Sequence, residues 1–143
     1  MSVELPFAPV DSIIRREAGD LRVSSDAAAE LARLIQDHGA ELAARAAKRA
    51  DADGRKTLMV EDFGADSAPD PNELTLPIAP VDRIARLDIP GEFRVSQDAR
   101  LVLADVLESY AEDVAEGGAV LAEHAGRRTI QAEDIRTYVR LVE

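Results

Sequence analysis

The sequence predicts an all-α protein in which two tandem copies of one helical unit pack together as an intramolecular pseudo-dimer. Three observations support this fold class. The sequence repeats itself, apolar residues recur at steps of three and four in both copies, and one helix in each copy is too long to bury its apolar face alone. With 143 residues, the chain is long enough for one ordinary domain or two very small ones.

The repeat is visible residue by residue. The segment Leu5–Asp11 (LPFAPVD) recurs as Leu76–Asp82 (LPIAPVD). After a slip of one residue, the two copies stay aligned at an offset of 72 positions, which pairs Gly54–Thr57 with Gly126–Thr129. Two copies of one unit of about 65 residues explain this pattern, and a unit of that size is marginal as an independent fold.

A linker separates the two copies. Residues 64–72 are rich in turn formers and carry no apolar side chain larger than Ala. This segment starts directly after Phe63, whereas the second copy continues past the equivalent Ile135. The sequence therefore predicts that the third helix is truncated in the first unit. The predicted organisation is a first unit over residues 1–63, a linker over 64–73 and a second unit over 74–143.

Each unit begins with a short helix and continues with a long one. Pro9 and Pro80 suit the first turn of the short helix. Ser24 and Ser96 are placed as N-caps of the long helix, which runs for about 27 residues without a proline. Such a helix is about 40 Å long and overhangs the rest of its unit, so it needs an equivalent partner.

Glycine ends both long helices, and a third helix follows in the second unit. Gly54 and Gly126 supply the stop signals. After a brief extended piece, residues 132–141 are predicted to be helical. The pair Gly117-Gly118 lies inside the second long helix and costs about 1 kcal/mol per glycine relative to alanine. Either another helix approaches closely there, or the pair is a tolerated weak point.

The composition is strongly acidic. The chain has 28 acidic and 17 basic residues, a net charge of -11, and its only lysines are Lys48 and Lys56. The acidic excess is shared by both halves, which is typical of organisms that keep molar salt in the cytoplasm, although an ordinary acidic protein remains an alternative. Bulk positive charge cannot be what holds a nucleic acid to this chain.

Several functional classes are disfavoured. The chain has no cysteine and only His38 and His124, so a disulfide framework and a Cys/His zinc site are excluded, and we expect no metal or cofactor. The carboxylate pairs Glu61-Asp62 and Glu133-Asp134 suit the first turn of a helix better than acid-base catalysis, so we expect no enzyme activity. Without an apolar segment long enough for a bilayer or a signal sequence, a cytoplasmic protein without membrane contact is expected.

Four segments carry a specific resemblance. Both copies contain, in the same order and spacing, Leu-Pro-(Phe/Ile)-Ala-Pro-Val, Arg-Val-Ser, Gly-Arg-(Lys/Arg)-Thr-(Leu/Ile) and Glu-Asp-(Phe/Ile). With the order short helix, long helix, short helix, these segments resemble the archaeal histone family, and two units in one acidic chain are similar to the tandem histone-fold doublets of halophilic archaea. The resemblance covers nearly all of the chain except the linker.

The resemblance implies two tandem histone folds and an architectural protein that bends or wraps duplex DNA on the chromosome. Such a protein contacts phosphates and the minor groove without reading bases. The alternative is an acidic histone-fold interaction or regulatory protein that binds DNA weakly or meets protein partners.

The resemblance also implies where DNA binds. The first loop of one unit is expected beside the second loop of the other, which makes two phosphate-binding ends, and the paired first helices provide a central contact. Ser12 stands where the second unit has Arg83, so the central contact is asymmetric. The implied DNA-binding residues are Arg15, Arg22, Val23, Ser24, Lys56, Thr57, Leu58, Arg83, Arg86, Arg94, Val95, Ser96, Arg128, Thr129 and Ile130.

Two structural ion pairs are implied in addition. Arg55 with Asp62, and Arg127 with Asp134, are expected to form buried salt bridges that brace the second loop of each unit.

Self-association is implied through the second unit alone. In the family, dimers join through the C-terminal end of the long helix and the third helix. The second unit carries Leu121, His124 and Asp134 at the matching positions, whereas the first carries Arg49 and Ala52 in place of the leucine and the histidine. We expect association to close at a pair of doublets. The alternative is that Leu121 and His124 merely pack within their own unit.

Overall fold

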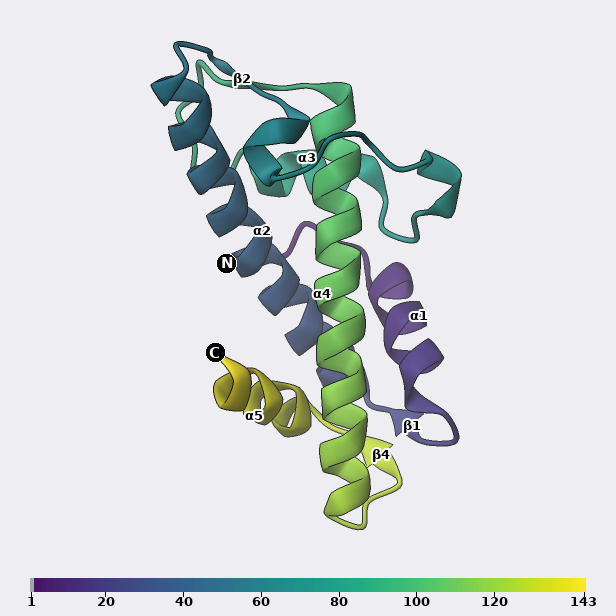
Figure 1. Ribbon diagram of the computed structural model, residues 1–143. Helices are drawn as coiled ribbons and strands as arrows, with labels where there is room; N and C mark the ends of the chain where they lie inside the picture. The colour runs from purple at the N-terminus through teal and green to yellow at the C-terminus, as the bar shows by residue number, and fades with distance from the viewer. Residues whose placement is uncertain (1) are drawn as a thin grey trace.

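A computed structural model describes residues 2–143 of the chain, so residue 1, the first position of the predicted first unit, lies outside the described residues. Helices follow one another in two similar sets, joined by short strands and two turns of 3-10 helix (Figure 1). The elements are α1 (Phe7–Ala18), β1 (Arg22–Val23), α2 (Ser25–Ala52), β2 (Thr57–Leu58), η1 (Val60–Phe63), η2 (Pro71–Glu73), α3 (Ile78–Ala85), β3 (Arg94–Val95), α4 (Gln97–His124), β4 (Thr129–Ile130) and α5 (Ala132–Val142).

The two long helices have the same length and the same caps. Both α2 and α4 contain 28 residues. The Ser24 hydroxyl oxygen accepts a hydrogen bond from the Ala27 N–H at 3.0 Å, and Ser96 does the same for Ala99 at 3.1 Å. Each helix ends two residues before a glycine with positive φ, as at Gly54 with φ 73°. The predicted caps and stop signals are therefore confirmed.

The long helices cross near their midpoints (Figure 1). His38 and Tyr110, which are equivalent positions in the two units, stack there with ring centroids 4.1 Å apart. Burial lowers the pKa of His38, so its imidazole is neutral at pH 7, and burial raises the pKa of Tyr110 to about 12. The stack lies on the pseudo-twofold axis that relates the two units.

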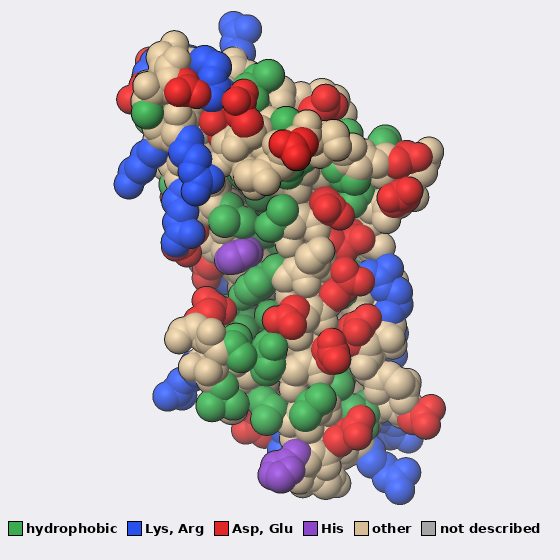
Figure 2. Space-filling model, in the orientation of Figure 1, with side chains coloured by type: hydrophobic (Ala, Val, Ile, Leu, Met, Phe, Trp, Pro, Cys, Tyr) green, Lys and Arg blue, Asp and Glu red, His purple; other side chains and the backbone are tan. Residues whose placement is uncertain are grey.

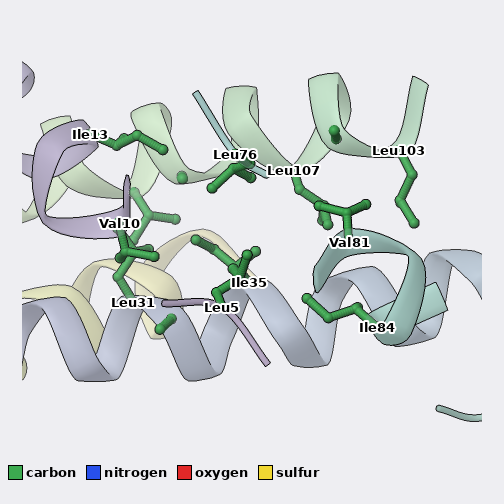
Figure 3. Close-up of a cluster of buried hydrophobic side chains, with 14 of the residues drawn as sticks. Leu5, Val10, Ile13, Leu31, Ile35, Leu76, Val81, Ile84, Leu103 and Leu107 are labelled. Carbon is green, nitrogen blue, oxygen red and sulfur yellow. The ribbon is translucent and has the colours of Figure 1, made fainter. Parts of the chain in front are cut away.

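Both units contribute to one hydrophobic core. Side chains from α1, α2, α3 and α4 interdigitate around the crossing (Figure 3). Val10 and Ile13 come from α1, Leu31 and Ile35 from α2, and Leu103 from α4, and all five are fully buried. The predicted intramolecular pseudo-dimer is confirmed, because neither unit encloses this core alone.

A buried polar side chain anchors the segment before the short helix of each unit. Gln36 on α2 accepts a hydrogen bond from the Glu4 N–H at 2.7 Å. At the equivalent position on α4, Glu108 accepts from the N–H groups of Thr75 and Leu76 at 2.5 and 2.9 Å. Each buried group therefore has a partner, and each fixes the entry of the chain into its short helix.

The third helix is the main difference between the units. The first unit forms only the 3-10 turn η1 after β2, whereas the second forms α5, which packs on α4 and α2. A Cβ atom built on Gly117 would overlap the Tyr138 ring, and one on Gly118 would lie 2.7 Å from Ile135 Cδ1. The glycine pair therefore serves close approach of α5, which settles the alternative left open by the sequence.

We expect the substitution Gly117→Ala to lower the free energy of unfolding by about 1–3 kcal/mol, because α5 must move away from α4. This loss has to exceed the gain of about 1 kcal/mol that alanine gives a helix over glycine. Urea unfolding monitored by circular dichroism measures the difference. Gly91→Ala is the control, since nothing lies within 4 Å of a Cβ atom there. A stabilised Gly117→Ala variant would contradict the close-approach interpretation.

Candidate nucleic-acid interface

A loop of one unit pairs with a loop of the other at each end of the molecule (Figure 1). Strand β1 pairs with β4 in parallel, with Arg22 opposite Thr129. Strand β2 pairs with β3 in the same way, with Thr57 opposite Arg94. The Arg22 N–H donates to the Arg128 carbonyl at 2.8 Å, which closes the first of these ends. The residues of each expected phosphate-binding end therefore lie side by side.

Three arginines at these ends are free to meet an anion. Arg22 and Arg128 lie at one end and Arg94 at the other, and all three side chains are exposed. Within residues 2–143 none of them forms an ion pair or a side-chain hydrogen bond. Because the chain carries a net charge of -11, such unpaired cations are where local potential departs most from the average.

Lys56 is held by its own chain. Its Nζ atom lies 2.6 Å from an Asp51 carboxylate oxygen, 3.8 Å from one of Glu92, and 5.0 Å from the centre of the Phe93 ring. The hydrogen bond that Lys56 donates to Asp51 is the main reason that the pKa of Lys56 is raised. A phosphate reaching Lys56 therefore competes with Asp51, and the net gain from this contact is smaller than from an unpaired arginine.

The remaining end residues divide by burial. Ser24 and Ser96 are half-buried and serve as helix caps, and Thr57 and Thr129 are half-buried beside them. Three of the residues implied by the resemblance have buried side chains and can offer only backbone groups to a ligand: Leu58, Val95 and Ile130. Val23 is half-buried.

The central surface carries arginines that already have carboxylate partners. Each of the three sequence-predicted cations on or after the short helices forms an ion pair within the chain. These pairs are Arg15 with Asp11 at 2.7 Å, Arg83 with Glu4 at 2.9 Å and Arg86 with Asp82 at 3.0 Å. The central surface therefore attracts anions less than the two ends do.

An ion pair braces the second loop of the first unit. The Arg55 guanidinium donates to both carboxylate oxygens of Asp62 at 2.9 Å, and it also donates to the Thr57 carbonyl at 3.0 Å. Burial alone would raise the pKa of Asp62, but the bonds from Arg55 and from the Met59 N–H outweigh it, so the pKa is lowered. Arg55 thus holds the loop that presents Lys56.

The second unit repeats this arrangement. Arg127 pairs with Asp134, and the Gln131 N–H donates to Asp134 at 2.8 Å. The Asp134 side chain is only 4% exposed. In both units the arginine therefore faces a carboxylate of its own chain and fixes the loop.

The Asp62 pair predicts a defined pH dependence. Because the folded pKa is below the ordinary value of 3.8, the stabilisation is fully present above about pH 4 and is lost as the pH falls through the folded pKa. We expect Asp62→Asn to lower the unfolding free energy at pH 7 by about 2–3 kcal/mol and to narrow the gap to wild type at pH 3. Urea unfolding at the two pH values measures both. Asp66→Asn, an exposed linker change, is the control, and a gap that does not vary with pH would exclude this role of Asp62.

The residues implied for self-association lie at the end of α4 and the start of α5. Leu121 is half-buried, His124 is exposed, and Asp134 is buried. Beside them is a hollow lined by Asp113, Glu116, Gly117, Val120, Leu121 and Tyr138. Sequence reasoning missed Val120, which is 61% exposed, and Tyr138, which donates to Asp113 at 3.1 Å. An outward valine on a helix was the available signal.

Residues 2–143 contain no cluster of three or more His, Cys, Asp or Glu side chains arranged to hold a metal ion. In the same range, no helix combines the length and apolar character needed to cross a bilayer.

Comparison with known proteins places the chain in a family. The profile for histone-like transcription factors (CBF/NF-Y) and archaeal histones matches residues 3–64 and again residues 74–139. The archaeal histone HAN1 of Thermococcus zilligii is 49% identical over 65 residues, which are 46% of this chain and 94% of that protein. Probable archaeal histone 3 of Methanocaldococcus jannaschii is 40% identical over 65 residues, with the same shares of the two chains.

Solved structures match both units at once. The crystal structure of the histone from Methanopyrus kandleri has a TM-score of 0.69 and 28% identity, and the match covers 94% of this chain and 92% of that one. A protein from Thermus thermophilus has the same TM-score at 20% identity, covering 97% of each chain, and supports the fold alone.

The paired loops, crossed long helices and double match define a tandem histone-fold protein. The chain belongs to the family of histone-like transcription factors (CBF/NF-Y) and archaeal histones. This is a family of DNA-binding structural proteins of the chromosome and not of enzymes, so the resemblance seen in the sequence is confirmed.

Proposed function

We propose that this protein bends or wraps duplex DNA, with phosphate and minor-groove contacts at its two loop ends and no base-specific readout. The observation that carries the proposal is the pairing of loops from the two units, which gathers exposed, unpaired arginines at both ends: Arg22 and Arg128 at one, Arg94 at the other. A helix of 28 residues separates the ends by about 40 Å. A duplex held at both ends must therefore follow the surface between them.

Each end offers phosphates two kinds of donor. Arginine supplies charge and can enter the minor groove, while the hydroxyls of Ser24, Thr57, Ser96 and Thr129 and nearby backbone N–H groups supply directed hydrogen bonds. None of these groups distinguishes one base pair from another, so sequence preference comes from how easily the DNA bends.

Salt sets how strongly such a protein binds. With about six phosphates neutralised, the slope of log affinity against log salt is about -5, so molar salt removes several decades of affinity. The even acidic excess and the scarcity of lysine fit a cytoplasm of that kind, with the protein on the chromosome. Binding in such a cell then depends on the few cations that are unpaired.

The second candidate is an acidic interaction or regulatory protein that binds DNA weakly or meets protein partners. The ion pairs of the central arginines and of Lys56 favour it, because each pair must be broken or shared before a phosphate is bound.

We expect Arg94→Glu and Arg128→Glu each to weaken binding to all duplexes and to flatten the salt slope by about one unit for each phosphate that is no longer bound. Fluorescence anisotropy with two duplexes of unrelated sequence over a salt series measures both quantities. Arg140→Glu is the matched control, since it makes the same charge change on α5, away from both loop ends. If both end variants bind like the control, the protein-partner function is the better one.

We propose further that two doublets associate through their second units. The exposed Val120 and Leu141, 61% and 70% exposed, lie on α4 and α5 near His124, and the first unit has neither α5 nor these apolar residues. The same face on both partners makes the contact isologous, so association closes at two chains.

His124→Ala is expected to confine the protein to single doublets, because the substitution removes the hydrogen-bonding imidazole from this contact. Size-exclusion chromatography with light scattering, with and without DNA, counts the chains per particle. The linker change Asp66→Asn should leave pairs of doublets intact. Particles that grow by one doublet at a time would show that the face of the first unit assembles as well.

A further inference from the structure

The C-terminal halves of the two long helices carry opposite charge at equivalent positions. Residues 41–52 of α2 contain three basic and two acidic residues, whereas residues 113–124 of α4 contain three acidic residues and no lysine or arginine. Arg45, Lys48 and Arg49, here called the basic stripe, stand where α4 has Gly117, Val120 and Leu121. In a chain of net charge -11, this is a local reversal of sign.

The basic stripe occupies one uncovered face of α2. Its three positions are spaced i, i+3 and i+4, so their side chains project from the same side of the helix. All three are exposed, and Figure 2 shows basic side chains gathered along the upper part of α2 in that view. Because Arg45 replaces Gly117, a third helix cannot dock on α2 as α5 docks on α4. The face is therefore open to a partner.

The stripe keeps most of its charge available. Arg45 pairs with Glu41 at 2.5 Å, but both side chains are 60% exposed, and exposed pairs of this kind are weak. Arg49 donates to the Asp62 carbonyl at 2.6 Å, which is a neutral acceptor. Lys48 forms no ion pair within residues 2–143. Three cations thus face solvent with one partly engaged carboxylate beside them.

The stripe is continuous with one of the DNA-binding ends. Lys48 and Lys56 line the same hollow, together with Asp51, Glu92 and Phe93. Lys56 belongs to the end formed by β2 and β3, where Arg94 is unpaired. Cationic side chains therefore run from this loop end along α2 without a break in the fold.

We propose that the basic stripe is a further DNA-binding surface, on which a duplex leaving the β2–β3 end lays its phosphates over Arg45, Lys48 and Arg49. The proposal rests on the DNA-binding function proposed above and extends it to one side only. The eleven residues from Arg45 to Lys56 span about 15 Å, which matches about five base pairs of duplex. The equivalent surface of α4 is acidic and repels DNA, so the footprint is longer at one end.

DNA fits this surface better than a second copy of the chain does. Duplex DNA carries one negative charge per about 1.7 Å of its axis, which supplies a partner for each cation of the stripe. The facing carboxylates that a second copy could offer are Asp113 and Glu116, and Asp113 already accepts the Tyr138 hydroxyl. Association through the stripe is nevertheless a distinct outcome of the tests.

The first test removes charge from the stripe and leaves Arg49 in place, because Arg49 bonds to the Asp62 carbonyl. The double variant Arg45→Gln, Lys48→Gln should flatten the salt slope by about two units on a duplex of about 40 base pairs and leave it unchanged on one of about 20 base pairs. The matched control is Arg33→Gln, Arg140→Gln, which makes the same change in net charge and also removes an exposed pair on α2. Equal slopes for the two double variants on the longer duplex, or an equal loss on both duplexes, would overturn the proposal.

The second test uses the absence of cysteine from the chain. A photocrosslinker attached to Lys48→Cys should react with the longer duplex near one end of the footprint. The same reagent on Val120→Cys, the equivalent position of α4, should not react with DNA. Crosslinks from position 48 to a second protein chain, or equal DNA crosslinking from both positions, would overturn the proposal.

The two proposals fail in different ways. If the stripe variant binds like its control while Arg94→Glu and Arg128→Glu weaken binding, only the basic stripe is excluded. If wild-type protein binds neither duplex at any salt concentration, the DNA-binding function itself is excluded and the stripe with it.

Discussion

The crossing of the two long helices is the constraint on which the rest of the structure depends. Each helix has 28 residues and exposes an apolar face that its own unit cannot cover, so each needs the other. Once they cross at His38 and Tyr110, the short helices fall on either side and the loops of opposite units meet at both ends. The paired loops, and with them the arginine positions, are therefore a geometric result of burying the apolar faces.

An acidic protein can bind an anion when its charges are arranged locally. Most of the basic side chains here have a carboxylate partner, which keeps much of the surface neutral or negative. The exceptions, such as Arg22, Arg94 and Arg128, lie at the loop ends, and the acidic surface elsewhere disfavours other orientations of the DNA. Charge pairing thus narrows where DNA can bind instead of abolishing binding.

The sequence was sufficient for the elements and insufficient for the partners of single side chains. Repetition, serine caps and glycine stops define the helices because these signals are local. The pair of Arg15 with Asp11 also follows a local spacing, but Arg83 meets Glu4 across 79 positions, which only the packed structure determines. The role of Gly117 likewise depends on where α5 lies. Comparing the two copies position by position would have found the basic stripe.

Joining the two units through the linker of residues 64–73 changes how the fold responds to dilution. Two separate units must meet in solution, so the folded fraction of such a dimer falls as its concentration falls. A short flexible tether instead holds the partner at an effective concentration in the millimolar range, whatever the number of molecules present. The folded fraction of this doublet is therefore independent of expression level. A cell can keep very few copies and each will still present both loop ends.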